Sequence, residues 1–141
     1  LLGKAGCREV SLGFESGSGR MLRNMNKTFG LDAVRRTSRM LREAGMKQTG
    51  FLLLGGPGET KETVEQSLAF AGSLDLDALK ITIGIRIYPH TKLAEIAAVD
   101  GLISEDDDLL LPKFYVVREI EAWIRDTVRS WTKSRPGWMS Q

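Results

Sequence analysis

The side chains in this sequence that could do chemistry lie in or at the ends of apolar segments. Glu15 closes a segment of alternating apolar and polar residues, where its carboxylate could hold an amino or hydroxyl group of a ligand. Lys80 and Arg86 occupy polar positions of a later segment, where cationic side chains could bind a carboxylate or a phosphate. Neutralisation of these two cations by Glu9 or Glu15 is the alternative. The pattern indicates a binding site for charged groups and identifies no catalytic residue.

A turn rich in glycine and proline, Gly55-Gly56-Pro57-Gly58, follows the apolar run 51–54. Glycines allow a ligand to approach the backbone, and a helix N-terminus offers free N–H donors to an anion. The turn is not a Walker loop, because Glu59-Thr60 stands where Lys-Ser/Thr is required and a glutamate repels phosphate. A tight turn before an ordinary helix explains the same residues equally well.

The remaining candidates give weaker signals. Cys7 is the single cysteine, so it excludes an internal disulfide and cannot supply the three or four ligands of a zinc or iron-sulfur site. We expect it to be a small buried hydrophobic residue. His90 follows a proline in a loop and is expected to be a solvated bystander, and the acidic stretch 105–108 a solvated loop. The sequence therefore predicts no metal site.

Composition is that of an ordinary globular domain: 141 residues, 42% hydrophobic and 27% charged, with a net charge of +2. This balance does not call for nucleic acid as a partner, and the apolar runs are too short to span a bilayer. Without a signal peptide, the expected location is the cytoplasm. The start at Leu1, with no methionine, is expected of a segment taken from a longer protein.

Hydrophobic periodicity predicts alternating strands and helices, and hence parallel βα units. Strands are expected at Glu9–Glu15, Lys47–Leu54 and Leu79–Tyr88, and helices at 21–25, 31–44, 60–71, 91–99 and 117–131. We expect a first domain at 1–115 and a C-terminal amphipathic helix with its tail at 116–141. The apolar stripe of that helix, flanked by Trp123 and Trp131, is expected to be core or a subunit contact.

The third expected strand has one apolar and one polar parity. Its polar positions are Lys80, Thr82, Gly84, Arg86 and Tyr88. A parallel strand covered by helices on both faces would be apolar throughout, so the pattern favours a barrel with a wet lumen or an exposed antiparallel face. The helical connections favour the barrel, with Lys80, Thr82 and Tyr88 as candidates to contact a substrate in its lumen.

Four motifs in order resemble the second half of a radical S-adenosylmethionine domain, over about residues 5 to 115. They are the run 13–18 with Leu22 and 25–27, the run 44–46, the turn 55–60 and the run 88–93. The resemblance is closest to the cobalamin-associated, methylthiotransferase and coproporphyrinogen oxidase branches. It implies a partial (β/α)6 barrel, a TIM-like α/β fold, of which this chain supplies strands four to six with their helices.

The resemblance also implies what lies outside the chain. In the family, the first half carries three cysteines that bind a 4Fe-4S cluster, and the cluster cleaves S-adenosylmethionine reductively to a radical. This sequence has no such triplet. The chain alone is therefore expected to be inactive, whereas the parent protein is expected to be an active enzyme. Its expected partners are the missing N-terminal half and an unidentified substrate, with cobalamin as a further cofactor in one branch. An isolated half-barrel is also expected to self-associate through its open edge.

Carried over position by position, the resemblance assigns the cofactor site. Glu15 matches a polar contact to S-adenosylmethionine with Ser16 beside it, and Lys27 matches a basic residue, often arginine, that meets the carboxylate of the cofactor. Backbone groups near the adenosyl part fall at Leu53, Gly55, Arg86 and Ile87. His90 replaces the glycine common in the last turn, which suggests that this turn tolerates a side chain.

Two other classes of function remain open on the sequence. One is a non-catalytic phosphate- or nucleotide-binding α/β module that uses the Gly55–Gly58 turn. The other is a structural domain that associates with partners through the helix carrying Trp123 and Trp131.

Overall fold

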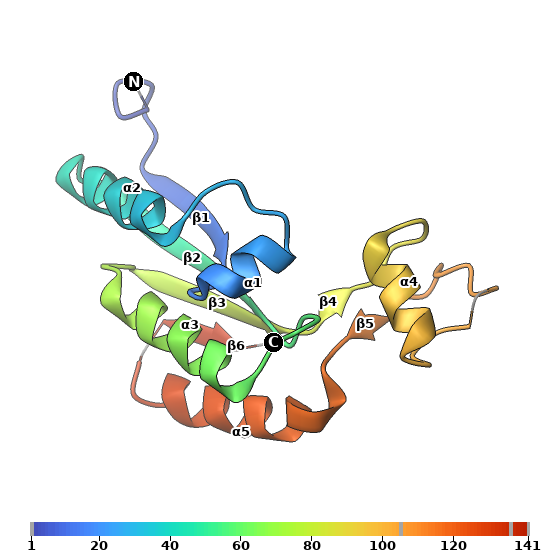
Figure 1. Ribbon diagram of the computed structural model, residues 1–141. Coiled ribbons are helices and arrows are strands. Elements are labelled where there is room, and N and C mark those ends of the chain that lie inside the picture. The colour runs from blue at the N-terminus through green and yellow to red at the C-terminus, as the bar shows by residue number, and fades with distance from the viewer. Residues whose placement is uncertain (1, 105, 136, 141) are drawn as a thin grey trace.

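The computed structural model describes residues 2–104, 106–135 and 137–140. The expected chain start at Leu1 and the first acidic residue of the 105–108 loop lie outside them. Figure 1 shows the order of the elements. The strands are β1 (Glu9–Glu15), β2 (Lys47–Leu54), β3 (Ala78–Ile83), β4 (Ile85–Arg86), β5 (Phe114–Tyr115) and β6 (Trp138–Ser140). The helices are α1 (Gly19–Asn24), α2 (Leu31–Glu43), α3 (Lys61–Ser73), α4 (Lys92–Val99) and α5 (Glu121–Thr132), with a 3-10 turn at Arg118–Ile120.

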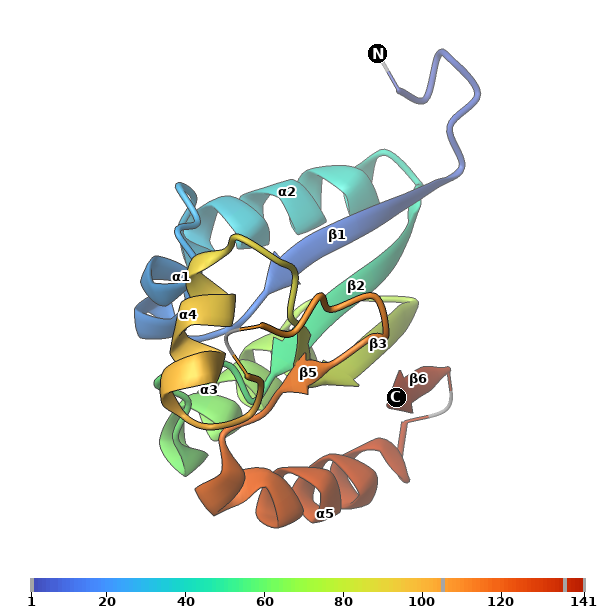
Figure 2. The same cartoon turned by 90° about the vertical axis from the view of Figure 1, so that its right-hand side faces the viewer.

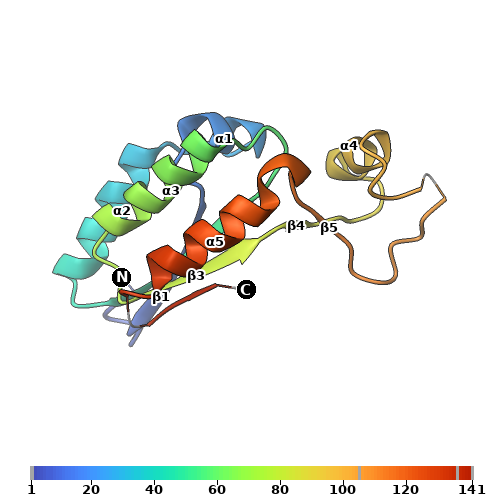
Figure 3. The ribbon, with the colours of Figure 1, turned by 90° about the horizontal axis from the view of Figure 1, so that it is seen from below.

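Four parallel strands form the main sheet in the order β1-β2-β3-β6. Seen along the sheet in Figure 3, helices α1, α2, α3 and α5 all lie on one side, and the other side carries no helix. A sheet that is wrapped by helices on one face only is the arrangement of a segment of a βα barrel. The predicted partial barrel is thus the observed fold.

The core lies between the sheet and its helices. Leu52, Leu54 and Ile81 are fully buried on the helix-facing side, and α5 adds Ile124 and Val128 to the same cluster. The stripe on the last helix is therefore core, one of its two expected roles. Because α5 shares the core of the sheet, it packs as part of the barrel layer, while the division at 115/116 stays a prediction.

The third strand differs from the prediction because it ends at Ile83. Gly84 has φ 99°, a left-handed conformation in which a side chain is strained, and a Cβ there would meet Val116 at 3.0 Å. The chain turns at this glycine into β4, which pairs antiparallel with β5. Alternation of apolar residues continues across the break, so the period alone could not reveal it.

The C-terminal region also differs. The expected helix from 117 begins as a 3-10 turn and becomes α-helical only at Glu121. The strands β5 and β6 were not predicted, since each has only two or three residues, too few to show a period. β6 lies beside β3, with Met139 opposite Lys80. The chain therefore adds a fourth strand to the three predicted.

A small second unit stands at the carboxyl end of the sheet. It consists of β4, α4, β5 and the connecting loop, and Figure 2 shows α4 and this loop in front of the strand ends. Its own cluster is built around Ile87, Ala97, Leu109 and Tyr115. The Tyr115 hydroxyl donates to Asp100 at 2.8 Å. Burial, and to a lesser degree this carboxylate, raises the pKa of Tyr115 to about 12.

In the part of the chain that the structure describes, no helix is long and apolar enough to cross a membrane.

Candidate functional site at the open face of the sheet

The open face of the sheet carries the less buried positions of each strand. Strand alternation and register place Gly13, Phe51 and Lys80 side by side across β1, β2 and β3, with Leu53 opposite Thr82 one step nearer the carboxyl ends. Three of the predicted site residues, Leu53, Lys80 and Thr82, thus share one face, and the Glu15 carboxylate lies beside Gly13 of the same face.

Glu15 ends β1 in an unusual backbone conformation. Its φ is 64°, and the Ser16 N–H donates to the Phe14 carbonyl at 2.7 Å across it, the pattern of a three-residue γ-turn. The pairing of β1 with β2 shifts register between Gly13 and Glu15. A Cβ built on Gly13 would lie 3.2 Å from Glu15 Oε1, so the carboxylate lies beside Gly13. Left-handed backbone at a non-glycine residue costs energy and is concentrated at functional sites.

Lys27 lies opposite this carboxylate. Its Nζ is 3.7 Å from Glu15 Oε1, and the two side chains are 32% and 21% exposed. The Lys27 N–H donates to the Leu22 carbonyl at 2.9 Å, which anchors the segment after α1. The structure therefore brings together the two residues that the sequence assigned to the charged end of one ligand. Opposite charges side by side, both partly open to solvent, complement a zwitterion such as an amino acid group.

Ser16 is oriented differently. Its side chain is completely buried, and its hydroxyl shares a hydrogen bond of 3.0 Å with that of Ser67 on α3. The Gly17 N–H also donates to Ser67 Oγ at 3.0 Å. Ser67 was missed in the sequence, although a serine on the apolar face of a predicted helix was a signal for it. In this arrangement the Ser16 side chain supports the turn at Glu15 and does not face a ligand.

The glycine turn is closed by its own glutamate. Glu59 is 4% exposed; its Oε2 accepts the Gly55 N–H at 3.2 Å, and its Oε1 accepts the Thr63 hydroxyl. Burial raises the pKa of Glu59, against the opposing effects of these hydrogen bonds and of the nearby Arg20 guanidinium. The N–H group that an anion would need is therefore already bonded to a carboxylate.

Residues beyond Gly84 do not continue the open face. Arg86 is exposed, with its guanidinium 4.9 Å from the ring centre of Tyr88, and Tyr88 is 53% exposed. Ile87 is buried in the second unit, where its N–H donates to the Lys113 carbonyl at 2.8 Å. The break at Gly84 thus separates Arg86, Ile87 and Tyr88 from the alternation that holds Lys80 and Thr82.

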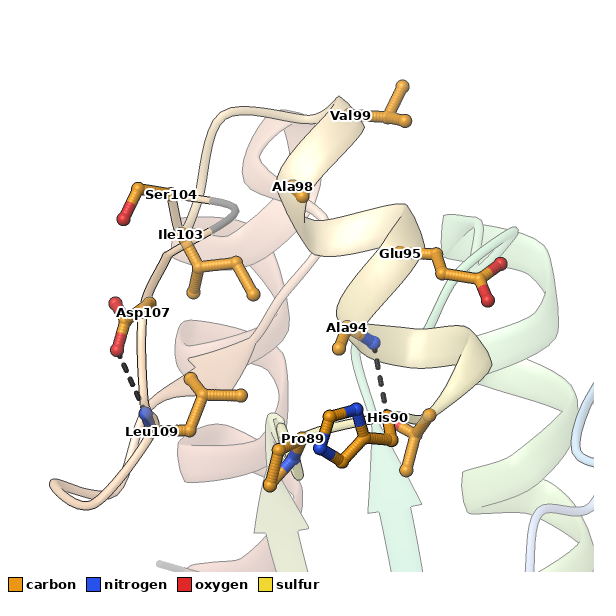
Figure 4. Close-up of a pocket in the computed structure, with 11 residues that line it drawn as sticks. Pro89, His90, Ala94, Glu95, Ala98, Val99, Ile103, Ser104, Asp107 and Leu109 are labelled. Atoms are coloured by element: carbon orange, nitrogen blue, oxygen red, sulfur yellow. Dashed lines mark hydrogen bonds between the residues drawn. The ribbon is translucent and has the colours of Figure 1, made fainter.

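A cavity of about 550 Å³ lies in the second unit, between α4 and the following loop. Figure 4 shows His90 and Pro89 at one end, with Ile103, Asp107 and Leu109 along one wall. His90 has φ 60°, which explains why a glycine suits this position, and the turn tolerates its side chain. The Lys113 ammonium and the Leu109 N–H lower the pKa of Asp107. Glu15, Lys27 and Lys80 are not among the residues that line this cavity.

The side chains of residues 2–104, 106–135 and 137–139 form no candidate metal site. No three histidine, cysteine, aspartate or glutamate side chains lie close enough together there to hold a metal ion. Cys7 is partly exposed, contrary to the expectation of burial, because it lies in the loop before β1. Cys7, the single cysteine, could supply at most one of the three or four ligands that an iron-sulfur cluster needs.

The fold and the site together define a class: a segment of a βα barrel with a pair of opposite charges at the carboxyl ends of its parallel strands. The family model for the radical SAM superfamily matches residues 1–71. The chain belongs to the radical SAM superfamily, whose members use S-adenosylmethionine and a 4Fe-4S cluster.

Curated relatives agree with this assignment. An uncharacterized methyltransferase of Pyrococcus horikoshii is 35% identical over 104 residues, which are 71% of this chain and 22% of that protein. The ribosomal protein uS12 methylthiotransferase RimO of Heliobacterium modesticaldum is 35% identical over 97 residues, 63% of this chain and 20% of that protein. The chain therefore spans about a fifth of the length of these relatives.

Solved structures give the same fold. The radical S-adenosylmethionine methyltransferase TsrM from Kitasatospora setae, with cobalamin and a [4Fe-4S] cluster bound, matches with a TM-score of 0.63 and 28% identity over 70% of this chain and 20% of that one. Elp3 of Methanocaldococcus infernus matches over 99% of this chain and 30% of that one, with a TM-score of 0.69 and 22% identity. The match to Elp3 supports the fold alone.

Proposed function

We propose that this chain forms the rear half of the S-adenosylmethionine site of a radical SAM enzyme. The observation that carries the proposal is the pair of opposite charges at 3.7 Å, Glu15 and Lys27, on the strained turn at the end of β1. In the proposal, the Glu15 carboxylate binds the amino group of the cofactor and the Lys27 ammonium its carboxylate. Each exchanges its partner in the free protein for a group of the cofactor.

The adenosyl part would lie further along the carboxyl ends. Leu53 is the last open-face residue of β2, and Gly55 begins the turn after it. This region is uncharged toward the open face, because Glu59 is buried beneath the turn. An uncharged, partly apolar surface suits an adenine base, which is held by packing and a few backbone hydrogen bonds. Arg86 and Ile87 remain candidates for the same role at the next strand end.

The remainder of the active site would come from the preceding half of the same polypeptide. β1 has a free edge, and a largely apolar cavity of about 290 Å³ opens beside it between Leu12, Phe14 and Phe29. Pairing of a further strand with this edge would continue the barrel and cover the cavity. That half would hold the iron-sulfur cluster, which supplies the electron that makes the cofactor reactive. Methyl or methylthio transfer is the type of reaction that we propose for the whole enzyme, with cobalamin as a second cofactor.

Isothermal titration of S-adenosylmethionine into a longer polypeptide that includes the preceding half tests the assignment. Glu15→Ala is expected to weaken binding at least about tenfold, because it removes one charge-assisted hydrogen bond. Glu9→Ala is the matched control, since Glu9 lies on the same face at the other end of β1. Equal affinity of the Glu15→Ala and control proteins would remove Glu15 from the site.

The two other classes of function gain no support. A phosphate-binding turn would need the Gly55 N–H that Glu59 accepts. Trp131 packs against Trp138 at 5.0 Å between ring centres, and both Trp123 and Trp131 pack against the core cluster, so these side chains already have a role within the fold. Self-association through the edge of β1 and a cytoplasmic location stay predictions.

A further inference from the structure

Lys80 is a lysine of the open face without a carboxylate partner. It lies in the middle of β3 and is half-buried between Phe51 of β2 and Met139 of β6. Among residues 2–104, 106–135 and 137–139, no side chain forms an ion pair or hydrogen bond with its ammonium group. The neutralisation by Glu9 or Glu15 that the sequence left open is therefore not found there.

The surroundings of Lys80 explain why it stays unpaired. Its described neighbours on the open face are uncharged: Thr49, Phe51, Leu53, Ala78, Thr82 and Met139. The two acidic residues of this face, Glu9 and Glu15, are both on β1, two strands and therefore about 10 Å away. Glu9 accepts the Thr49 hydroxyl at 2.8 Å, and Glu15 faces Lys27. Each acid thus has a nearer partner.

We infer that Lys80, with the Thr82 hydroxyl beside it, binds an anionic group of the substrate. This inference rests on the proposed function, because the open face becomes a lumen only when the barrel is completed. Thr82 lies two residues further along the same face, about 6.6 Å toward the carboxyl ends where the cofactor would lie. A carboxylate or phosphate between the two would accept from both. The substrate is thus anionic at one end, with an apolar body that contacts Phe51 and Met139.

The placement also separates two charged sites on one face. The pair Glu15 and Lys27 is balanced and suits a zwitterion, whereas Lys80 is a single cation and suits a net anion. Phe51 lies between them in the register Gly13, Phe51, Lys80. An anionic substrate at Lys80 would therefore not compete for the charges that bind the cofactor.

The test is a nuclear magnetic resonance titration, at constant ionic strength and with two probes, of the longer polypeptide that includes the preceding half and completes the barrel. Inorganic phosphate represents a phosphorylated substrate, and benzoate represents a carboxylate with an apolar body. Both Lys80→Met and Lys80→Gln should raise the midpoint of the effective probe's titration at least about tenfold, because a charge-assisted hydrogen bond is lost. Lys47→Met, on the same face at the amino end of β2, should leave it unchanged.

Amide shifts at Leu53, Thr82 and Met139 on adding either probe, abolished in a folded Lys80 variant, support the inference, and the effective probe identifies the anion. Shifts that persist in that variant, shifts confined to the arginines of α2, or no shift with either probe would overturn it. A parallel titration with S-adenosylmethionine keeps the two proposals apart. Glu15→Ala should weaken only the binding of S-adenosylmethionine, and Lys80→Gln should weaken only the binding of the probe. If the original protein binds the probe through Lys80 but does not bind S-adenosylmethionine, the proposed function is contradicted and the anion site at Lys80 still stands.

Discussion

Replacing Glu15 by glycine and by alanine separates the two roles of this position. Both changes remove the carboxylate and its pair with Lys27, but only glycine adopts a φ of 64° without strain. If the structure holds Glu15 in a strained turn, the glycine protein is more stable than the alanine protein. The comparison isolates backbone strain, since the loss of the ion pair is common to both.

The magnitude follows from three contributions. The left-handed conformation costs a non-glycine residue about 1 to 2 kcal/mol, and the greater freedom of glycine in the unfolded chain takes back about 0.5 to 1 kcal/mol. Glu15→Gly should therefore exceed Glu15→Ala by about 1 kcal/mol in the free energy of unfolding, or about 4 °C in Tm for a chain of this length. The partly exposed pair with Lys27 is worth about 0.5 kcal/mol. Glu15→Gly should accordingly match the original protein to within about 0.5 kcal/mol.

Urea unfolding followed by circular dichroism measures these differences, with equal slopes of the transitions as the check that one process is compared. Titration of S-adenosylmethionine into the longer polypeptide completes the assay, because both variants should lose affinity equally. Equal stability of the two variants, or a more stable alanine protein, would refute the claim of strain. A glycine protein that keeps full affinity would refute the role of the carboxylate.

Two further predictions concern the contacts that hold this turn and the next one. Gly17→Ala should lower the free energy of unfolding by about 2 kcal/mol, because a Cβ there would lie 2.4 Å from the Cβ of Phe70 and 2.7 Å from the Cα of Ser67. Gly19→Ala, whose nearest contact would be at 3.6 Å, should change it by less than about 0.5 kcal/mol, so equal urea midpoints would contradict the close approach. Burial raises the pKa of Glu59 above 4.5, so its contribution to stability is complete below pH 4.5 and is lost as pH rises through the raised pKa. The stability of the original protein relative to Glu59→Gln should therefore fall as pH rises from 4 to 8 in urea titrations, and a difference independent of pH would exclude an ionisable, buried Glu59.

Alternation and helical periodicity were enough to predict the layers of the fold. The bounds of β1 and β2 agree with the expected strands, because each ends in a turn with polar or glycine residues. The polar parity of β3 correctly indicated a face without helices. These features are local, since a side chain on a strand alternates between faces whatever its neighbours are.

The features that could not be predicted depend on distant parts of the chain. The strand break at Gly84 arises because Val116, Phe114 and Tyr115 lie against it, and their positions are set by β5. β6 forms only because three residues near the end of the sequence pair with the edge of β3, which lies about 60 positions earlier in the chain. Likewise, the family resemblance assigned Glu15 and Lys27 separately to one cofactor site, whereas their pairing with each other depends on the path of the chain after α1.

The conformation of Glu15 is fixed by α3 more than by its own strand. The turn cannot relax by moving away from α3, because Gly17 N–H and the Ser16 hydroxyl both bond to Ser67, and it cannot move closer, because Gly17 already contacts Phe70. A strained residue persists only where its surroundings determine it in this way. Since α3 begins at the glycine turn that Glu59 closes, the same helix fixes the strand ends at both Glu15 and Leu53. The two ends of the proposed cofactor site are therefore held at a constant separation by one rigid element, which is the arrangement that a preorganised binding site requires.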